Sequence, residues 1–201
     1  MKKRSGQIFL FSLLASFIML FACYSPPQSV EPGPTPPLDP IKALFIKAET
    51  SLTEKNFAKA LASLDDIIIK EPENIKAHIL RATTYEFMLD IQKAQDDLEK
   101  VITLEPRNFT AHYNIGNIFF KNADYESAVY HYTLSIVFGD SFYKAFLNRA
   151  NAYMKLEKYQ NALDDYKKYI QYSDYQRQKI LMLIEILEDV LITTSKPEDS
   201  L

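Results

Sequence analysis

The chain has 201 residues, 47% of them hydrophobic and 13% aromatic, with only four glycines, so it can form a hydrophobic core and is not an intrinsically disordered protein. Its formal charge is −3, and no run of lysine and arginine is interleaved with aromatic residues, which excludes nucleic acid as an expected partner. The single cysteine excludes an internal disulfide framework and a multi-cysteine metal site.

The first 22 residues have the layout of a secretory signal peptide. A positive stretch at residues 2–4 is followed by a 14-residue apolar run at residues 8–21, and Ala22 directly precedes Cys23. The run is shorter than the roughly 18 residues that cross a hydrocarbon core, which disfavours the alternative of a retained transmembrane helix. Loss of the three basic residues with the leader would leave a formal charge of −6.

The residues around the cysteine resemble the bacterial lipobox. Leu20 stands three residues before Cys23 and a small alanine stands just before it, although Phe21 is bulkier than the residue usual at its position. The resemblance implies cleavage before Cys23 and lipidation of that residue, which would anchor the chain in a membrane. The alternative is an ordinary leader that happens to contain a cysteine. We predict a lipid anchor in the cell envelope, and Tyr24 favours the outer membrane by the commonest sorting rule.

A proline-rich segment follows the cysteine. Seven of the ten prolines lie between Pro26 and Pro40, in the stretch YSPPQSVEPGPTPPLDP. Such a composition favours extended polyproline II, at roughly 3.1 Å per residue. We predict that residues 23–40 form the lipidated cysteine and a tether, the alternative being a ligand for an aromatic groove.

The rest of the chain repeats with a period of 34 residues. Alanines recur at this spacing at Ala60, Ala94, Ala128 and Ala162. Small residues recur 12 positions earlier, at Ala48, Ala82, Gly116 and Ala150. A third series marks the breaks, at Pro72, Pro106, Asp140 and Asp174. Small residues within apolar helical patterns allow two helices to approach closely, and proline or aspartate between units starts a new turn and helix.

This pattern resembles the tetratricopeptide repeat. The third unit, within AHYNIGNIFFKNADYESAVYHY, matches best, and the first is weakest because Lys47 and Ser51 replace the usual leucine and tyrosine. The resemblance implies an all-α, right-handed α-solenoid of four helix pairs, closed by a capping helix. The predicted units are 41–74, 75–108, 109–142 and 143–176, followed by a capping helix at 177–193 and a disordered tail at 194–201.

The helices expected inside these units follow from the apolar periodicity. They span residues 41–54 and 57–70, 75–88 and 91–104, 109–122 and 125–138, and 143–156 and 159–172. A ninth helix, about 177–192, has one apolar face suited to covering the last repeat, and we expect Glu185, Glu188 and Asp189 to face water. Because Met182 and Ile186 widen its apolar stripe, this helix is also a candidate homo-oligomer contact, the alternative being coverage by its own neighbours.

The family resemblance implies a concave groove lined by the first helix of each pair, in which partner proteins lie. Asparagine amides there can pair with a ligand backbone while apolar residues take its side chains. The predicted groove residues are Tyr113, Asn114, Asn117, Phe120, Lys144, Leu147, Asn148, Asn151 and Met154. The alternative is that these residues only pack the core. A terminal-carboxylate clamp is not expected, because Ile79, Thr83 and Asn148 replace the residues that such a clamp requires.

We find no residues arranged for catalysis. No HExxH, GxSxG or phosphate-binding glycine loop occurs, and His78 and His112 occupy equivalent packing positions 34 apart. Three acidic pairs, at residues 65–66, 96–97 and 164–165, are expected on solvated faces, and a metal site there lacks further oxygen ligands. We predict no enzyme activity, cofactor or metal.

The expected function is therefore a membrane-anchored adaptor that holds partner proteins at the bacterial envelope. The alternative is an accessory subunit of a solute or lipid transport system that binds a small apolar ligand. A surface-displayed protein that contacts host molecules stays open as a third class, because sorting after Cys23 differs between bacteria.

Overall fold

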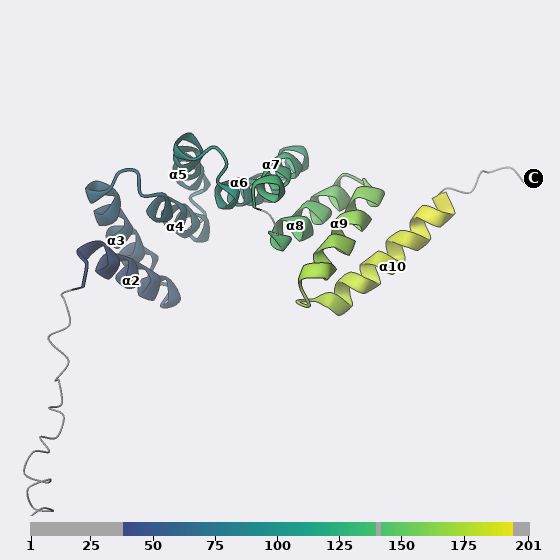
Figure 1. Cartoon of the computed structure of the whole chain (residues 1–201), viewed down its shortest axis with the longest axis horizontal. Helices are drawn as coiled ribbons and strands as arrows, with labels where there is room; N and C mark the ends of the chain where they lie inside the picture. The colour runs from purple at the N-terminus through teal and green to yellow at the C-terminus, as the bar shows by residue number, and fades with distance from the viewer. Residues whose placement is uncertain (1–37, 140–141, 195–201) are drawn as a thin grey trace, which may run out of the picture. The chain divides into compact units, whose positions relative to one another are not determined.

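The computed structural model describes residues 38–139 and 142–194. The contacts divide the chain into Met1–Leu38 and Asp39–Leu201, and the second unit is described here. The predicted signal peptide, Cys23, nearly all of the tether and the tail beyond Thr194 lie outside the described residues. Within the described ranges every regular element is an α-helix, which confirms the all-α fold (Figure 1). None of these helices is long and apolar enough to span a bilayer.

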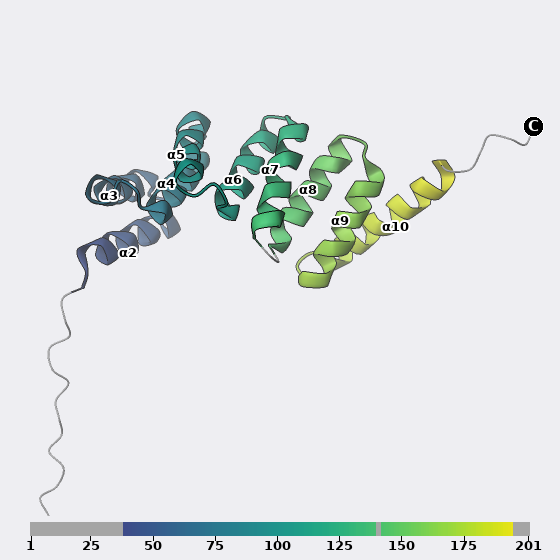
Figure 2. The ribbon, with the colours of Figure 1, turned by 45° about the horizontal axis from the view of Figure 1, so that its top comes forward.

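The helices begin and end within two residues of the expected positions. Their bounds are α2 Pro40–Thr53, α3 Phe57–Lys70, α4 Ile75–Phe87, α5 Ile91–Leu104, α6 Phe109–Lys121, α7 Tyr125–Phe138, α8 Tyr143–Lys155, α9 Tyr159–Tyr172 and α10 Arg177–Thr194. Each helix packs against the next one in the chain, so the pairs stack in sequence order (Figure 2).

Asparagine caps start the first helices of the second and third repeats. The side chain of Asn74 accepts a hydrogen bond from the Ala77 N–H, and Asn108 accepts one from Ala111. Each cap amide also donates to a glutamate three residues earlier, in the turn that holds the repeating proline. The bonds to Ala77 and Ala111 satisfy backbone N–H groups that the first turn of a helix leaves unpaired, so each of these helices begins at a defined residue.

The turn inside each helix pair contains a residue in the left-handed backbone region. The four residues lie 34 apart and have φ of 57°, 62°, 61° and 56°, and they are Lys55, Leu89, Ala123 and Glu157. None is glycine, so each carries a Cβ that this conformation disfavours. The tight turn, which brings the second helix back against the first, therefore recurs at a conformational cost in every repeat.

The small residues of the repeat lie where helices meet. The six alanines paired across Ala48/Ala60, Ala82/Ala94 and Ala150/Ala162 have no exposed surface, and neither has Ala128. At Gly116 a Cβ would lie 2.7 Å from a ring carbon of Tyr132, so the third repeat has a glycine there because a tyrosine ring covers it. The spacing of the alanines is thus a spacing of close helix contacts.

Buried ion pairs tie neighbouring helices together, which corrects the expectation that the acidic pairs are solvated. Asp97 and Asp165 are each only 5% exposed. Arg81 binds both carboxylate oxygens of Asp97 and reaches Asp65 of the preceding repeat at 2.7 Å. The first members, Asp96 and Asp164, are exposed. The expectation was wrong because an arginine on the facing helix compensates the buried charge, and the positions of the acidic residues alone do not show that contact.

The fourth repeat has the same arrangement. Arg149 binds both oxygens of Asp165 at 2.7 and 2.8 Å and donates to Thr133 of the preceding repeat. Burial raises the pKa of Asp165 despite the hydrogen bonds from Arg149. Desolvation of this carboxylate therefore affects its pKa more than the hydrogen bonds from Arg149 do.

In the third repeat His131 occupies the position that the buried Asp97 has in the second repeat, and it contacts His112. Nδ1 of His112 lies 3.2 Å from Nδ1 of His131, and Nε2 of His112 lies 3.1 Å from the carbonyl oxygen of Pro106. Because Nε2 of His112 donates to that carbonyl, its Nδ1 accepts from His131. Burial, with the nearby His112, lowers the pKa of His131 to about 4, so His131 is neutral at physiological pH.

The helix α10 covers the last repeat as expected. Ile180, Ile184 and Leu187 are buried against the cluster that contains Tyr166 and Tyr169. Glu185 and Asp189 are exposed. The side chain of Glu188 is 46% exposed and pairs with Lys167 of α9 at 2.6 Å.

Candidate functional site

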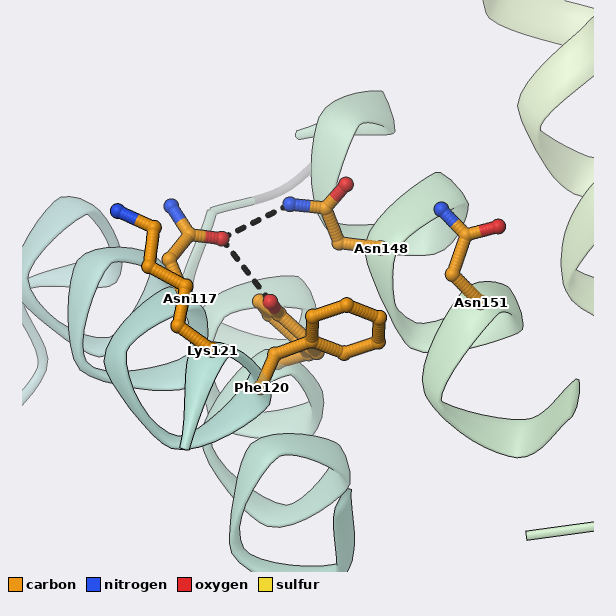
Figure 3. A pocket seen from close by; sticks show the side chains of 6 residues that line it. Asn117, Phe120, Lys121, Asn148 and Asn151 are labelled. Carbon is orange, nitrogen blue, oxygen red and sulfur yellow. Dashed lines mark hydrogen bonds between the residues drawn. The ribbon is translucent and has the colours of Figure 1, made fainter. Parts of the chain in front are cut away.

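A hollow of about 280 Å³ lies between α6, α7 and α8 (Figure 3). Three asparagines from the first helices of the third and fourth repeats face it, together with one aromatic ring, one lysine and one buried tyrosine. The lining residues are Asn117, Phe120, Lys121, Tyr132, Asn148 and Asn151. Helix geometry explains the clustering, since Asn148 and Asn151 are three residues apart and share one side of α8.

Hydrogen bonds hold the amides in place. The Tyr132 hydroxyl donates to Oδ1 of Asn117 at 2.9 Å, and Nδ2 of Asn148 donates to the same oxygen at 2.8 Å (Figure 3). Burial raises the pKa of Tyr132 well above its usual value, so its hydroxyl keeps the proton that it donates. The network thus fixes the orientation of Asn117 from two different helices.

Asn148 and Asn151 are held in the same way. Nδ2 of Asn148 also donates to the Tyr113 hydroxyl at 3.1 Å, and the Tyr166 hydroxyl donates to Oδ1 of Asn151 at 2.7 Å. Burial raises the pKa of Tyr166 to about 12, which keeps that hydroxyl a donor.

These bonds use only part of the hydrogen-bonding capacity of the asparagines. Each amide has two N–H donors and one carbonyl acceptor. Among the described residues no side-chain bond uses Oδ1 of Asn148 or Nδ2 of Asn151, whereas Asn117 also interacts with the Tyr113 hydroxyl. No buried polar side-chain atom of the described part lacks a partner, so these groups are open to solvent or to a ligand. The hollow therefore offers an amide donor and an amide acceptor beside the Phe120 ring.

A charged pair and an aromatic ring form the rest of the lining. Nζ of Lys121 lies 2.7 Å from Oε2 of Glu86, a residue of α4 whose side chain is 12% exposed. Phe120 stacks edge-on against Tyr125 with ring centroids 5.4 Å apart. The lysine and glutamate neutralise one another, so the hollow carries little net charge on this side.

The structure brings only four of the nine predicted groove residues to the hollow: Asn117, Phe120, Asn148 and Asn151. Tyr113 does not line it and is partly buried against Tyr132 and the Phe142 ring. Leu147 and Met154 pack on the core of the last repeat. Asn114 is partly buried and Lys144 is exposed, and neither lines the hollow. Tyr113, Leu147 and Met154 thus pack between helices, whereas Phe120 and three of the four predicted asparagines line the hollow.

Lys121 and Tyr132 line the hollow and were not predicted. Tyr132 belongs to the second helix of its pair, whereas the prediction considered first helices alone. The glycine at position 116 was the available signal, because a residue without a side chain lets a large ring reach the groove side.

The described residues contain no group of three or more histidine, cysteine or acidic side chains placed to hold a metal ion. Of the three histidines, His78 contacts Asp97 and Pro72, and the other two contact each other. All three therefore take part in packing between helices, as their spacing suggested for the first two.

Comparisons with known proteins agree with this geometry. Profiles of the tetratricopeptide repeat match residues 79–141 and 143–174. No curated protein matches the chain. Among solved structures, 196 chains match, and three of them are described here.

MamA residues 41 to the end from Desulfovibrio magneticus RS-1 superpose with a TM-score of 0.61, at 15% identity over 79% of this chain and 98% of that chain. PilF of Pseudomonas aeruginosa gives 0.66, at 16% identity over 74% of this chain and 67% of that one. The O-GlcNAc transferase of Thermobaculum terrenum, a K341M mutant, gives 0.58 at 16% identity, over 66% of this chain but only 26% of the enzyme.

At identities this low, the likeness shows a shared fold alone. Tetratricopeptide repeats are typically non-enzymatic scaffolds for protein–protein interaction. Over residues 79–174 the profile matches coincide with the helix pairs and with the 34-residue series. The chain therefore contains tetratricopeptide repeats and folds as a solenoid of tetratricopeptide-type helix pairs.

Proposed function

We propose that this chain is a non-enzymatic adaptor that binds an extended segment of a partner protein in the hollow between α6, α7 and α8. The observation that carries the proposal is the set of oriented amides of Asn117, Asn148 and Asn151 at one hollow, where Oδ1 of Asn148 and Nδ2 of Asn151 are open. A peptide backbone alternates carbonyl acceptors and N–H donors, which is the chemistry that such amides complement.

The surroundings favour a largely uncharged ligand segment with an apolar side chain. Lys121 is already paired with Glu86, so no free charge of the lining attracts a charged group. The Phe120 ring offers an apolar surface for one side chain of the ligand. The bonds from Tyr132 and Tyr166 fix two of the amides beforehand, which lowers the entropic cost of binding.

The proposed adaptor acts at the bacterial cell envelope, on envelope proteins, and is held there through lipid on Cys23. Support comes from the leader, the lipobox-like residues 20–23 and the proline-rich spacer. The predicted spacer would let the repeats reach partners away from the bilayer.

The alternative is a subunit of a transport system that holds a small apolar ligand. The volume of about 280 Å³ is near the lower end of small-molecule sites, and Phe120 is an apolar part of its lining. Native mass spectrometry distinguishes the two, because a retained small molecule would support the transport function and a co-purifying protein would support the adaptor.

A photo-crosslinking residue in place of Lys121, introduced in intact cells, tests the adaptor. We expect a discrete adduct with one envelope protein, identified by mass spectrometry. The matched control places the same residue at Tyr130 of α7, which is 61% exposed and does not line the hollow. The Asn151→Ala variant should weaken the Lys121 adduct strongly without changing the helical circular-dichroism signal. An adduct that forms equally from both sites, or that ignores Asn151→Ala, would contradict the proposal.

A further inference from the structure

The outer face of α10 carries a short stripe with paired charges. At 100° per residue, five side chains of α10 lie within about 40° of the line opposite the buried Ile184. They are Lys179, Met182, Ile186, Asp189 and Thr193, and the first four form the stripe. Met182 and Ile186 are 59% and 55% exposed, and Lys179 and Asp189 are exposed as well. The spacings of three, four and three residues are those of the contact seam between two paired helices.

No other described helix covers this face. α10 packs on α9 through its opposite side, and it is the last helix of the series (Figures 1 and 2). Among the ion pairs of the described residues, none includes Lys179 or Asp189, whereas Glu188 at the edge of α10 pairs with Lys167. The apolar pair in the centre and the two charges at its ends are therefore available to a partner.

The order of these residues is complementary to itself when reversed. Lys179 and Asp189 each lie five residues from Ile184, on opposite sides, and Met182 and Ile186 each lie two residues from it. We propose that α10 pairs antiparallel with α10 of a second copy of this chain, about a two-fold axis near Ile184. Lys179 then faces the partner's Asp189, and Met182 faces the partner's Ile186.

The charges select this direction over the parallel one. In a parallel pair Lys179 would face the partner's Lys179, and the two aspartates would also face each other, which is unfavourable. The antiparallel pair forms two opposite-charge contacts around an apolar centre. An interface of about four residues per copy is smaller than the roughly 800 Å² per partner of a standard complex, so we expect a weak dimer.

Sedimentation of the purified full chain, in one non-ionic detergent for all variants, tests the proposal. Between about 10 μM and 1 mM, the range set by a weak interface, we expect the mass to rise toward that of two chains. Met182→Glu with Ile186→Glu should keep the chain monomeric over this range. The matched control, Tyr130→Glu with Val137→Glu, changes two equally exposed apolar residues of α7 and should dimerise like the unaltered chain.

A charge exchange tests the direction of pairing on residues that are too exposed to affect folding. Lys179→Asp alone should weaken dimerisation by about tenfold or more, because it places two carboxylates opposite each other at both ends of the seam. Adding Asp189→Lys should restore it to nearly the original affinity. A chain that stays monomeric at the highest concentration would overturn the proposal. Dimerisation that is unchanged by Met182→Glu with Ile186→Glu would also overturn it. The same holds if adding Asp189→Lys to Lys179→Asp does not restore the affinity.

Discussion

Arg81 binds Asp97 with two parallel hydrogen bonds, Nε to Oδ2 at 2.8 Å and Nη2 to Oδ1 at 2.7 Å. The aspartate side chain is only 6% exposed and also contacts Nδ1 of His78 at 2.8 Å. The third arginine nitrogen reaches Asp65, so the guanidinium joins two repeats. A carboxylate this deeply buried is stable only because both of its oxygens are paired.

Removal of this carboxylate should destabilise the fold. Asp97→Ala leaves Arg81 and His78 without their main partner, and we expect a loss of about 3 kcal/mol in the free energy of unfolding. Urea denaturation followed by circular dichroism measures it. As a control, Lys93→Ala breaks the exposed ion pair with Asp90 and should leave the unfolding midpoint almost unchanged. Similar losses from both variants would show that burial does not govern these pairs.

A methyl group at Gly116 should disturb the hollow. Its Cβ would lie 2.7 Å from a ring carbon of Tyr132, and we expect Gly116→Ala to cost about 1–3 kcal/mol as the ring is displaced. The second repeat already combines Ala82 with Leu98 at the two equivalent positions. Adding Tyr132→Leu should therefore recover much of the stability measured by thermal unfolding. The double variant still lacks the hydroxyl that orients Asn117, so ligand binding at the hollow should stay weak.

Glycine in the turns should stabilise the chain. Leu89 has φ of 62° and is 83% exposed, so Leu89→Gly removes the penalty of its Cβ without removing a buried contact. We expect a gain of about 1 kcal/mol, seen as a higher unfolding midpoint. Leu89→Ala keeps a Cβ and serves as the control. Equal effects of the two variants would assign the gain to loss of the exposed leucine and not to the backbone.

The histidine pair should make stability depend on pH. The folded pKa of His131 is lowered to about 4, whereas the unfolded chain titrates near 6.5, so the unfolded state takes up the proton first. The stabilisation is complete above about pH 6.5 and is lost as the pH falls toward 4. We expect a loss of about 2 kcal/mol between pH 7 and pH 5.

The His131→Asn variant isolates this effect, because asparagine can still donate to Nδ1 of His112 but does not titrate. Denaturant titrations of both proteins at pH 7 and pH 5 should show a smaller loss in the variant. Titration of the carboxylates is common to both and cancels in the comparison. Equal losses would assign the pH dependence to other groups.

Lipidation of Cys23 is a separate prediction. Growth with an alkyne-bearing fatty acid should label the chain, and Cys23→Ser should abolish the label and release the repeats from the membrane fraction. Labelling that survives in the Cys23→Ser variant, or an unaltered chain that carries no label, would contradict the lipobox resemblance. Neither result would affect the binding proposed at Asn117 and Asn151.

The predictable part of the candidate site was its amides. Asn117 and Asn151 occupy the same position in successive repeats, and their period places them on one side of their helices. Leu147 and Met154 share that periodic face, yet they pack on the last core cluster. A helical period gives the direction of a side chain and not the distance to the neighbouring helix, so it does not separate groove from core.

The sequence by itself determined the helices, their pairing and their order, because a 34-residue period of small residues requires a close helix contact at each recurrence. Only the tertiary structure decided which polar residues are buried and which are free. Arg81 meets Asp97 from the facing helix, and Tyr132 fixes Asn117 across a glycine. Both contacts depend on how closely two helices approach, and that distance is set by all the side chains between them.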